Sequence, residues 1–175
     1  MTRQHGFTPI ELLTAVAILG IIATIAVPGV ILARQAGNEA SAVGSLRAIN
    51  NAQTSYAASC GSGYYSPSLD NLGTAPAGGE AFISAELGTA ASVTKSGYVV
   101  TMASSTGVAA TAPASCNGLA IGTAVRGYFA TATPLVSAGT RAFGTNTTGA
   151  IVSTVSQAAL VMTDTTAPVG AHPMQ

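Results

Sequence analysis

The feature that most constrains this chain is an apolar run near its N-terminus. From Leu12 to Ala33, 22 consecutive residues carry no ionisable side chain. As an α-helix such a run is about 33 Å long, close to the hydrocarbon thickness of a bilayer. A single carboxylate, that of Glu11, stands directly before the run. The sequence therefore predicts a membrane-crossing helix with one acid at its head.

Pro9 indicates where this helix begins. Inside a helix a proline costs about 3 kcal/mol, but in the first turn its missing N–H has no helical partner anyway. We therefore expect the helix to begin near Phe7 or Thr8, with residues 1–6 outside it. The stretch from Thr8 to Glu11 also fits a capping box, in which Thr8 is the N-cap and Glu11 is the third helical residue.

Three interpretations of the N-terminus are open on these grounds. It is a secretory signal cut near Ala26, an uncleaved anchor, or a short leader removed after Gly6. Removal after Gly6 would create an amine on Phe7, one helical turn from Glu11. In a packed bundle of such helices a bare carboxylate is costly, and an amine from a neighbouring subunit would neutralise it. Arginines on both sides of the run leave the orientation open.

The helix is expected to continue beyond the apolar run. Apolar residues recur there every three or four positions, which is the spacing of one helix face. They are Ala36, Ala40, Val43, Leu46, Ile49, Ala52 and Tyr56. One helix from Phe7 to about Ala58 would be on the order of 75 Å long. Pro28 and Gly29 should kink or loosen it midway.

The remaining sequence predicts an α+β fold, in which the long helix packs on a small antiparallel sheet. Segments 96–104, 123–133, 139–143 and 149–154 are rich in strand-forming residues, and 144–148 is typical of a hairpin loop. The expected organisation is a leader at 1–6, a membrane or filament-core helix at 7–33, and an amphipathic continuation at 34–59. A globular β domain with a loop-rich connector follows at 60–162, and a disordered tail at 163–175.

Two cysteines, Cys60 and Cys116, follow the apolar run. An even number of cysteines beyond a membrane-crossing segment favours a disulfide formed in an oxidising compartment over two free thiols. In the chain-entropy model a loop of this length is worth about 4 kcal/mol.

The composition offers little for catalysis or nucleic-acid binding. Charged residues make up 7% of the chain, against about 25% in an ordinary soluble domain, and the six basic residues are scattered. The two histidines lie in the expected leader and tail, so no catalytic triad, metal site or cofactor site is predicted. Asp164 is expected to be solvated, and Arg141 to pair with an acid or stack on Phe143 within the sheet.

The stretch from Gly6 to Leu13, followed by an apolar run with Gly20 and Pro28, closely resembles the prepilin N-terminal motif. That motif belongs to type IV pilins and to the pseudopilins of type II secretion systems. The resemblance implies that a prepilin peptidase cleaves after Gly6 and methylates the new amine of Phe7. It also implies assembly into a helical filament, in which Glu11 pairs with the Phe7 amine of a neighbour.

The same resemblance implies a subunit that waits in the bacterial inner membrane with its globular domain in the periplasm. An ATP-driven machine would then draw it into the filament, where the segment between Gly20 and Pro28 could unwind. Two residues depart from the usual pattern: His5 replaces a basic residue before the glycine, and Pro9 replaces an aliphatic residue.

We expect a structural subunit of a cell-surface, type IV pilus-like filament, and not an enzyme. The low charge and the Ser/Thr-rich composition favour this over a periplasmic pseudopilin of a type II secretion system. The alternative from another class is a membrane-anchored extracytoplasmic binding domain with an ordinary signal. It predicts a helix broken after Pro28 and no role for Glu11.

Overall fold

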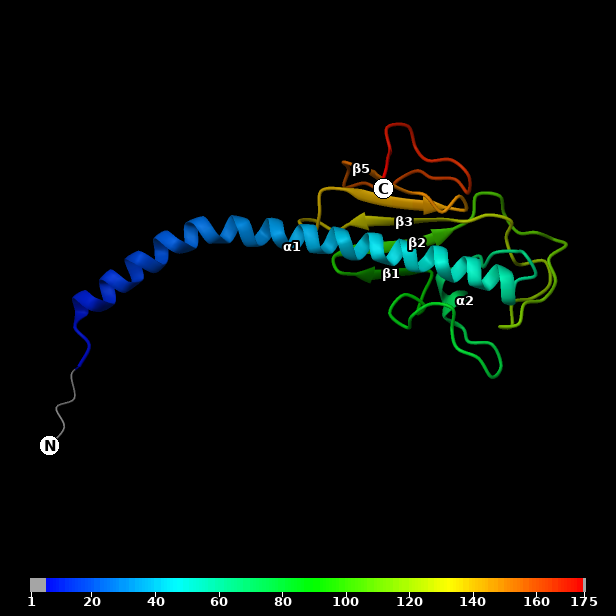
Figure 1. The fold of residues 1–175 in the computed structure, drawn as a ribbon, viewed down its shortest axis with the longest axis horizontal. Coiled ribbons are helices and arrows are strands. Elements are labelled where there is room, and N and C mark those ends of the chain that lie inside the picture. Colours follow the sequence, from blue (N-terminus) through cyan, green and yellow to red (C-terminus); the bar gives the residue numbers. More distant parts are fainter. Residues whose placement is uncertain (1–5, 175) are drawn as a thin grey trace.

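A computed structural model describes residues 6–174 and confirms the expected α+β fold. A long helix, α1 (Pro9–Ser59), leads into a domain with a short helix, α2 (Leu69–Gly73), and one sheet (Figure 1). The strands are β1 (Ser92–Lys95), β2 (Tyr98–Ala103), β3 (Phe129–Pro134), β4 (Ala142–Asn146), β5 (Ile151–Thr154) and β6 (His172–Pro173). They pair in chain order, each antiparallel to the next.

Helix α1 runs unbroken through Pro28, as expected from the sequence, and begins at Pro9. Figure 1 shows it bending through its N-terminal half, which projects away from the domain. Because proline has no N–H, Pro28 leaves the carbonyl of Thr24 without its helical donor. The first half of α1 is therefore one exposed helix that lacks one backbone hydrogen bond, at the carbonyl of Thr24.

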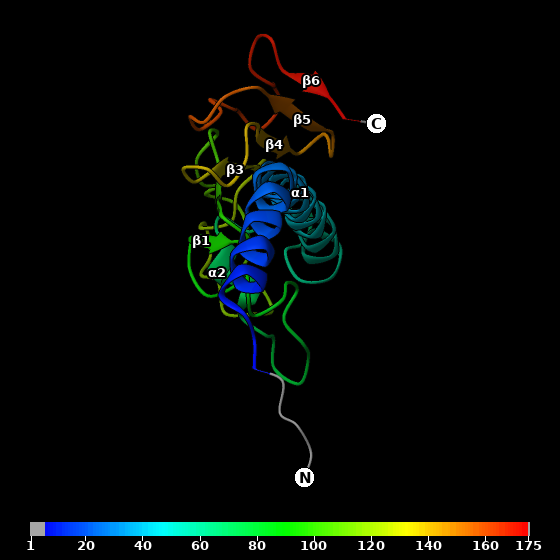
Figure 2. The same ribbon diagram turned by 90° about the vertical axis from the view of Figure 1, so that its left-hand side faces the viewer.

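The C-terminal half of α1 lies against one face of the sheet, as the end-on view in Figure 2 shows. Leu46, Ile49 and Tyr56 are fully buried there, which confirms the predicted apolar face at these positions. Ala36 and Ala40 were expected on the same face but are exposed. Both line an open groove between α1 and β4, and the buried residues of α1 begin at Glu39.

The predicted strands are found, with shifted ends. β2 and β5 lie within the predicted segments, whereas β3 begins only at Phe129 and β4 extends to Asn146. The residues before Phe129 instead form isolated bridges, in which Val125 pairs with Tyr65 and Val108. Three of the five residues of the expected hairpin loop, 144–146, therefore belong to β4. Strands β1 and β6 and helix α2 were not expected, because they are too short to show a period.

The prediction of a disordered tail at 163–175 is wrong for the part that the structure describes. Strand β6 pairs with β5, and the Met174 N–H donates to the carbonyl of Ile151 at 2.8 Å. The N–H of Thr147 donates to the carbonyl of Asp164 at 3.1 Å. The tail is polar and contains proline, but its backbone groups find partners on the edge of the sheet.

Candidate functional site

The head of α1 forms the predicted capping box. The Thr8 N–H and hydroxyl both donate to Glu11 Oε2, at 2.9 and 2.5 Å, and the Glu11 N–H donates to Thr8 Oγ1 at 3.4 Å. Pro9 occupies the first helical turn, where its missing N–H costs nothing. The carboxylate also faces the positive end of the helix dipole. Among residues 6–174, only Thr8 forms hydrogen bonds with the Glu11 side chain.

Gly6 and Phe7 lie just outside the helix, and the Phe7 side chain is 79% exposed. The cap uses the backbone N–H of Thr8 and not any group of Phe7. Cleavage between Gly6 and Phe7 would therefore leave the capping box intact. Both of its donors bind Oε2, and no residue from 6 to 174 donates to Oε1 of Glu11.

The apolar half of α1 is exposed on every side. Each residue from Leu12 to Ala33 is exposed, and α1 is long and apolar enough to cross a membrane by length and composition. Gly20 and Gly29 have no neighbouring atoms where a side chain would start. Gly20 and Pro28 thus lie in a helix that no other described part of the chain supports.

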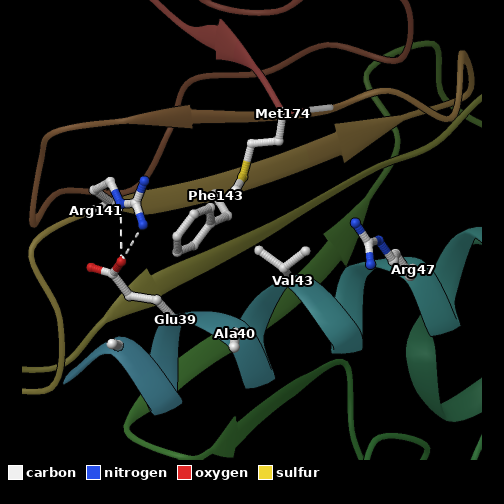
Figure 3. Close-up of a pocket in the computed structure, with 8 residues that line it drawn as sticks. Glu39, Ala40, Val43, Arg47, Arg141, Phe143 and Met174 are labelled. Atoms are coloured by element: carbon white, nitrogen blue, oxygen red, sulfur yellow. Dashed lines mark hydrogen bonds and ion pairs between the residues drawn. The ribbon is translucent and has the colours of Figure 1, made fainter. Parts of the chain in front are cut away.

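At the other end of the apolar run, α1 joins the domain through a partly buried ion pair (Figure 3). Arg141 donates to Glu39 Oε2 from Nε at 2.9 Å and from Nη2 at 2.6 Å. The N–H and hydroxyl of Thr140 donate to Oε1 at 3.1 and 3.2 Å. Burial works to raise the pKa of Glu39, but the guanidinium and these donors outweigh it and hold the pKa below its ordinary value.

Arg141 also stacks on Phe143, with its guanidinium carbon 5.5 Å from the ring centroid. The predicted ion pair and the predicted stack are therefore both present, although the acid belongs to α1 and not to the sheet. Beside this pair a groove of ≈ 320 Å³ separates α1 from β4 (Figure 3). It is lined by Ala36, Glu39, Ala40, Val43, Arg47, Arg141, Phe143 and Met174.

Three more polar contacts join the same stretch of α1 to the domain. Gln35 Nε2 donates to the carbonyl of Ser137 at 3.3 Å, and Asn38 Nδ2 donates to that of Ala138 at 3.0 Å. The hydroxyl of Ser41 donates to the hydroxyl of Ser96 at 2.9 Å. We call α1 residues 35–41, with their partners in the loops 95–97 and 135–141, the polar clamp. It fixes the domain to the helix immediately after the apolar run.

The disulfide between Cys60 and Cys116 is present, as predicted. Cys60 is the C-cap of α1, and its N–H donates to the carbonyl of Tyr56 at 2.9 Å. Nearby, Asn117 Nδ2 donates to the carbonyl of Asn71 at 2.7 Å. The bond therefore ties the end of α1 to the long loop between β2 and β3.

Asp164 was expected at the solvated surface, and this expectation is wrong. The residue is 1% exposed, and its carboxylate accepts hydrogen bonds from the N–H groups of Ser105 and Thr106 at 2.8 and 3.0 Å. The hydroxyls of Ser104 and Thr106 donate to it as well. Burial works to raise its pKa, but these donors hold the pKa below the ordinary value. Asp164 thus fixes the C-terminal segment to residues 104–106, at the start of the loop between β2 and β3.

Residues 6–174 contain no group of three His, Cys, Asp or Glu side chains that could hold a metal ion. His172 is exposed in β6, and His5 lies outside the described residues. Asn146, which begins a glycosylation sequon, is 4% exposed, and its Oδ1 accepts from the Thr148 N–H at 3.1 Å. It acts in the turn after β4, as the sequence indicates.

The comparison with protein families bears on the head of α1. A family model described as the prokaryotic N-terminal methylation motif matches residues 1–27. This motif is the hallmark of type IV pilin and pseudopilin precursors, and the match includes Gly6, Phe7, Glu11 and Gly20. Comparison with curated proteins and with solved structures gives no match. The chain thus carries the N-terminal motif of a type IV pilin or pseudopilin-type precursor, which implies processing by a prepilin peptidase and assembly into a filament.

The structure brings Gly6, Phe7 and Glu11 together at one end of α1 and joins Cys60 to Cys116 at the other. Sequence reasoning missed the structural roles of Glu39 and Asp164. No local pattern in the sequence distinguishes these two acids from Asp70 and Glu80, which are exposed.

Proposed function

We propose that this chain is a structural subunit of a type IV pilus-like filament, cleaved after Gly6, methylated on Phe7 and assembled through its N-terminal helix. One observation carries the proposal. The first half of α1 is apolar, exposed on every side and headed by a single carboxylate, and it lies within the segment that matches the methylation motif. Such a surface needs a covering, first lipid and then the helices of other subunits.

Glu11 supplies the specificity of this packing. At the membrane surface the cap and water satisfy its carboxylate, but in a bundle of apolar helices water is excluded and the remaining charge is costly. Oε1, to which no described residue donates, is the oxygen that would accept from the Phe7 amine of the next subunit. The pair would set the axial register between subunits while the contacts with Thr8 persist.

The mass of the mature N-terminus tests the processing step. We expect a chain that begins at N-methylated Phe7 both in inner membranes and in material sheared from the cell surface. Presence in the sheared fraction distinguishes a surface filament from a periplasmic pseudopilus, which is processed in the same way. A chain that begins after Ala26 or retains Met1 would contradict the proposal.

Two substitutions separate assembly from capping. Glu11→Gln keeps a side-chain oxygen but removes the charge, and it should abolish or sharply reduce filaments while the monomer still accumulates in membranes. Thr8→Ala keeps the charge, removes the cap hydroxyl at a cost of about 1 kcal/mol, and should leave filaments in place. Glu80→Gln, at an exposed position of the domain, is the matched control. Normal filaments from Glu11→Gln would show that the carboxylate has no role in assembly.

The course of α1 favours this proposal over an extracytoplasmic binding domain with an ordinary signal. That alternative requires a break after Pro28, whereas α1 continues to Ser59. Within the filament we propose that the segment between Gly20 and Pro28 loosens. Pro28 already removes one backbone hydrogen bond there, and none of residues 6–174 outside the helix packs on the segment.

A further inference from the structure

The polar clamp places one loop of the domain at the level where α1 leaves the apolar run. Gln35, which binds the carbonyl of Ser137, lies only about 3 Å further along the helix axis than Ala33. Asn38 binds the neighbouring carbonyl of Ala138. If the apolar run crosses a bilayer, the loop 135–141 therefore lies at the headgroup level of that bilayer.

This loop directs aliphatic side chains outward. Val136 is 89% exposed and Leu135 is 45% exposed. The turn that presents them is held by its own backbone: the Leu135 N–H donates to the carbonyl of Gly97 at 2.8 Å, and the Ala138 N–H donates to that of Leu135 at 3.0 Å. The exposed side chains thus stand on a fixed turn at one end of the sheet.

The charged side chains near this loop either form ion pairs or are basic. Arg141 pairs with Glu39, and Lys95 pairs with Glu86 at 2.7 Å. Arg34 is exposed and has no partner among the residues that the structure describes. We call Arg34 and the loops 95–97 and 135–141 the proximal rim. Fixed aliphatic side chains beside an unpaired arginine match the boundary between anionic headgroups and acyl chains.

We propose that the proximal rim rests on the surface of a phospholipid bilayer in the membrane-anchored subunit, with Val136 and Leu135 at the headgroup–acyl boundary. The proposal rests on the membrane anchoring that is part of the proposed function. The rim is continuous with the membrane-crossing run through the polar clamp, and this argues for lipid as its occupant. The clamp holds the domain to the helix, so entry into a filament would have to lift the rim off the membrane.

The chain contains no tryptophan, which permits a direct test with single introduced probes. Val136→Trp places the probe on the rim, and Leu32→Trp places it at the end of the apolar run. Ile121→Trp is the matched control. Ile121 is also strongly exposed, 74% against 89% for Val136, and it follows Cys116 by five positions. Cys116 is bonded to Cys60 at the far end of α1, on the order of 36 Å from Gln35 along the helix. The full chain is reconstituted in phosphatidylcholine–phosphatidylglycerol vesicles, with or without bromine atoms on the upper acyl chains.

We expect brominated lipid to quench the tryptophans at positions 32 and 136 but not the one at position 121. Tryptophan itself favours the membrane interface, and the control carries the same preference. Quenching at position 32 alone would overturn the proposal and leave the anchoring intact. A blue-shifted but unquenched probe at position 136 would also overturn it, because the rim would then be covered by a second copy of the chain. No quenching at position 32 would overturn the anchoring as well.

Discussion

Replacing Glu39 with alanine should destabilise the domain by about 2–3 kcal/mol. Its carboxylate accepts four hydrogen bonds, two of them from the guanidinium of Arg141, and its side chain is only 10% exposed. Removing one partner of a fully buried pair costs about 3–5 kcal/mol, and a hydrogen bond to a charged group is worth about 1.5–3 kcal/mol. The Arg141 side chain is 42% exposed and can be hydrated, so the cost should fall below the fully buried case.

A double-mutant cycle isolates the pair. Arg141→Met keeps an unbranched apolar stem and removes the guanidinium, and combining it with Glu39→Ala should reveal a coupling energy of about 1–2 kcal/mol. The pair between Lys95 and Glu86 is the control, since both partners are more exposed than Glu39 and such pairs are worth less than about 1 kcal/mol. Urea unfolding of the full chain in detergent, followed by near-ultraviolet circular dichroism of the tyrosines, gives the free energies of unfolding.

The pH dependence of the free energy of unfolding tests the Glu39–Arg141 pair independently. Because the folded-state pKa of Glu39 is lowered, its stabilisation is present above the ordinary glutamate pKa and is lost as the pH falls through the folded value. Unfolding of Glu39→Ala should therefore depend less on pH in the acidic range than unfolding of the natural chain. Two results together would refute the assigned role of Glu39. They are a coupling energy no larger than that of the control pair, and an acidic pH dependence of unfolding that Glu39→Ala leaves unchanged.

Other predictions follow from the remaining contacts. Reducing the disulfide between Cys60 and Cys116 should lower the free energy of unfolding by about 4 kcal/mol, measured by urea unfolding with and without reductant. Asp164→Asn places an amide among donors and should cost about 2–3 kcal/mol, with a weaker loss of stability as the pH falls through the lowered pKa of Asp164. Burial raises the pKa of Tyr98 and of Tyr128 to about 12, so ultraviolet titration should show both ionising late. Since the unfolded tyrosines ionise near about 10, stability should fall between these two pH values.

The head of α1 could be predicted from the sequence because its contacts are local. Thr8, Pro9 and Glu11 stand within one helical turn, and the capping box depends only on their spacing. The apolar half of the helix was equally predictable, since its length and composition follow from consecutive residues. The strands β2 and β5 were found for the same reason.

The contacts that fix the domain to the helix could not be predicted, because their partners lie far apart in the chain. Glu39 and Arg141 are separated by 102 positions, and the sequence around each residue does not indicate its partner. Asp164 depends on backbone N–H groups, which every residue but proline possesses, so no pattern marks its site. Strand β6 is two residues long and contains a proline, and only its position beside β5 makes it a strand.

The apolar run has polar contacts at both of its ends and almost none between them. At one end the capping box holds Glu11, and at the other the polar clamp begins at Gln35. In between, the hydroxyls of Thr14 and Thr24 bind only carbonyls of the preceding helical turn. Loosening the backbone near Pro28 would therefore break neither the cap nor the clamp. If the segment between Gly20 and Pro28 loosens in a filament, as we propose, α1 would lengthen while Glu11 and the domain stay held by contacts outside that segment.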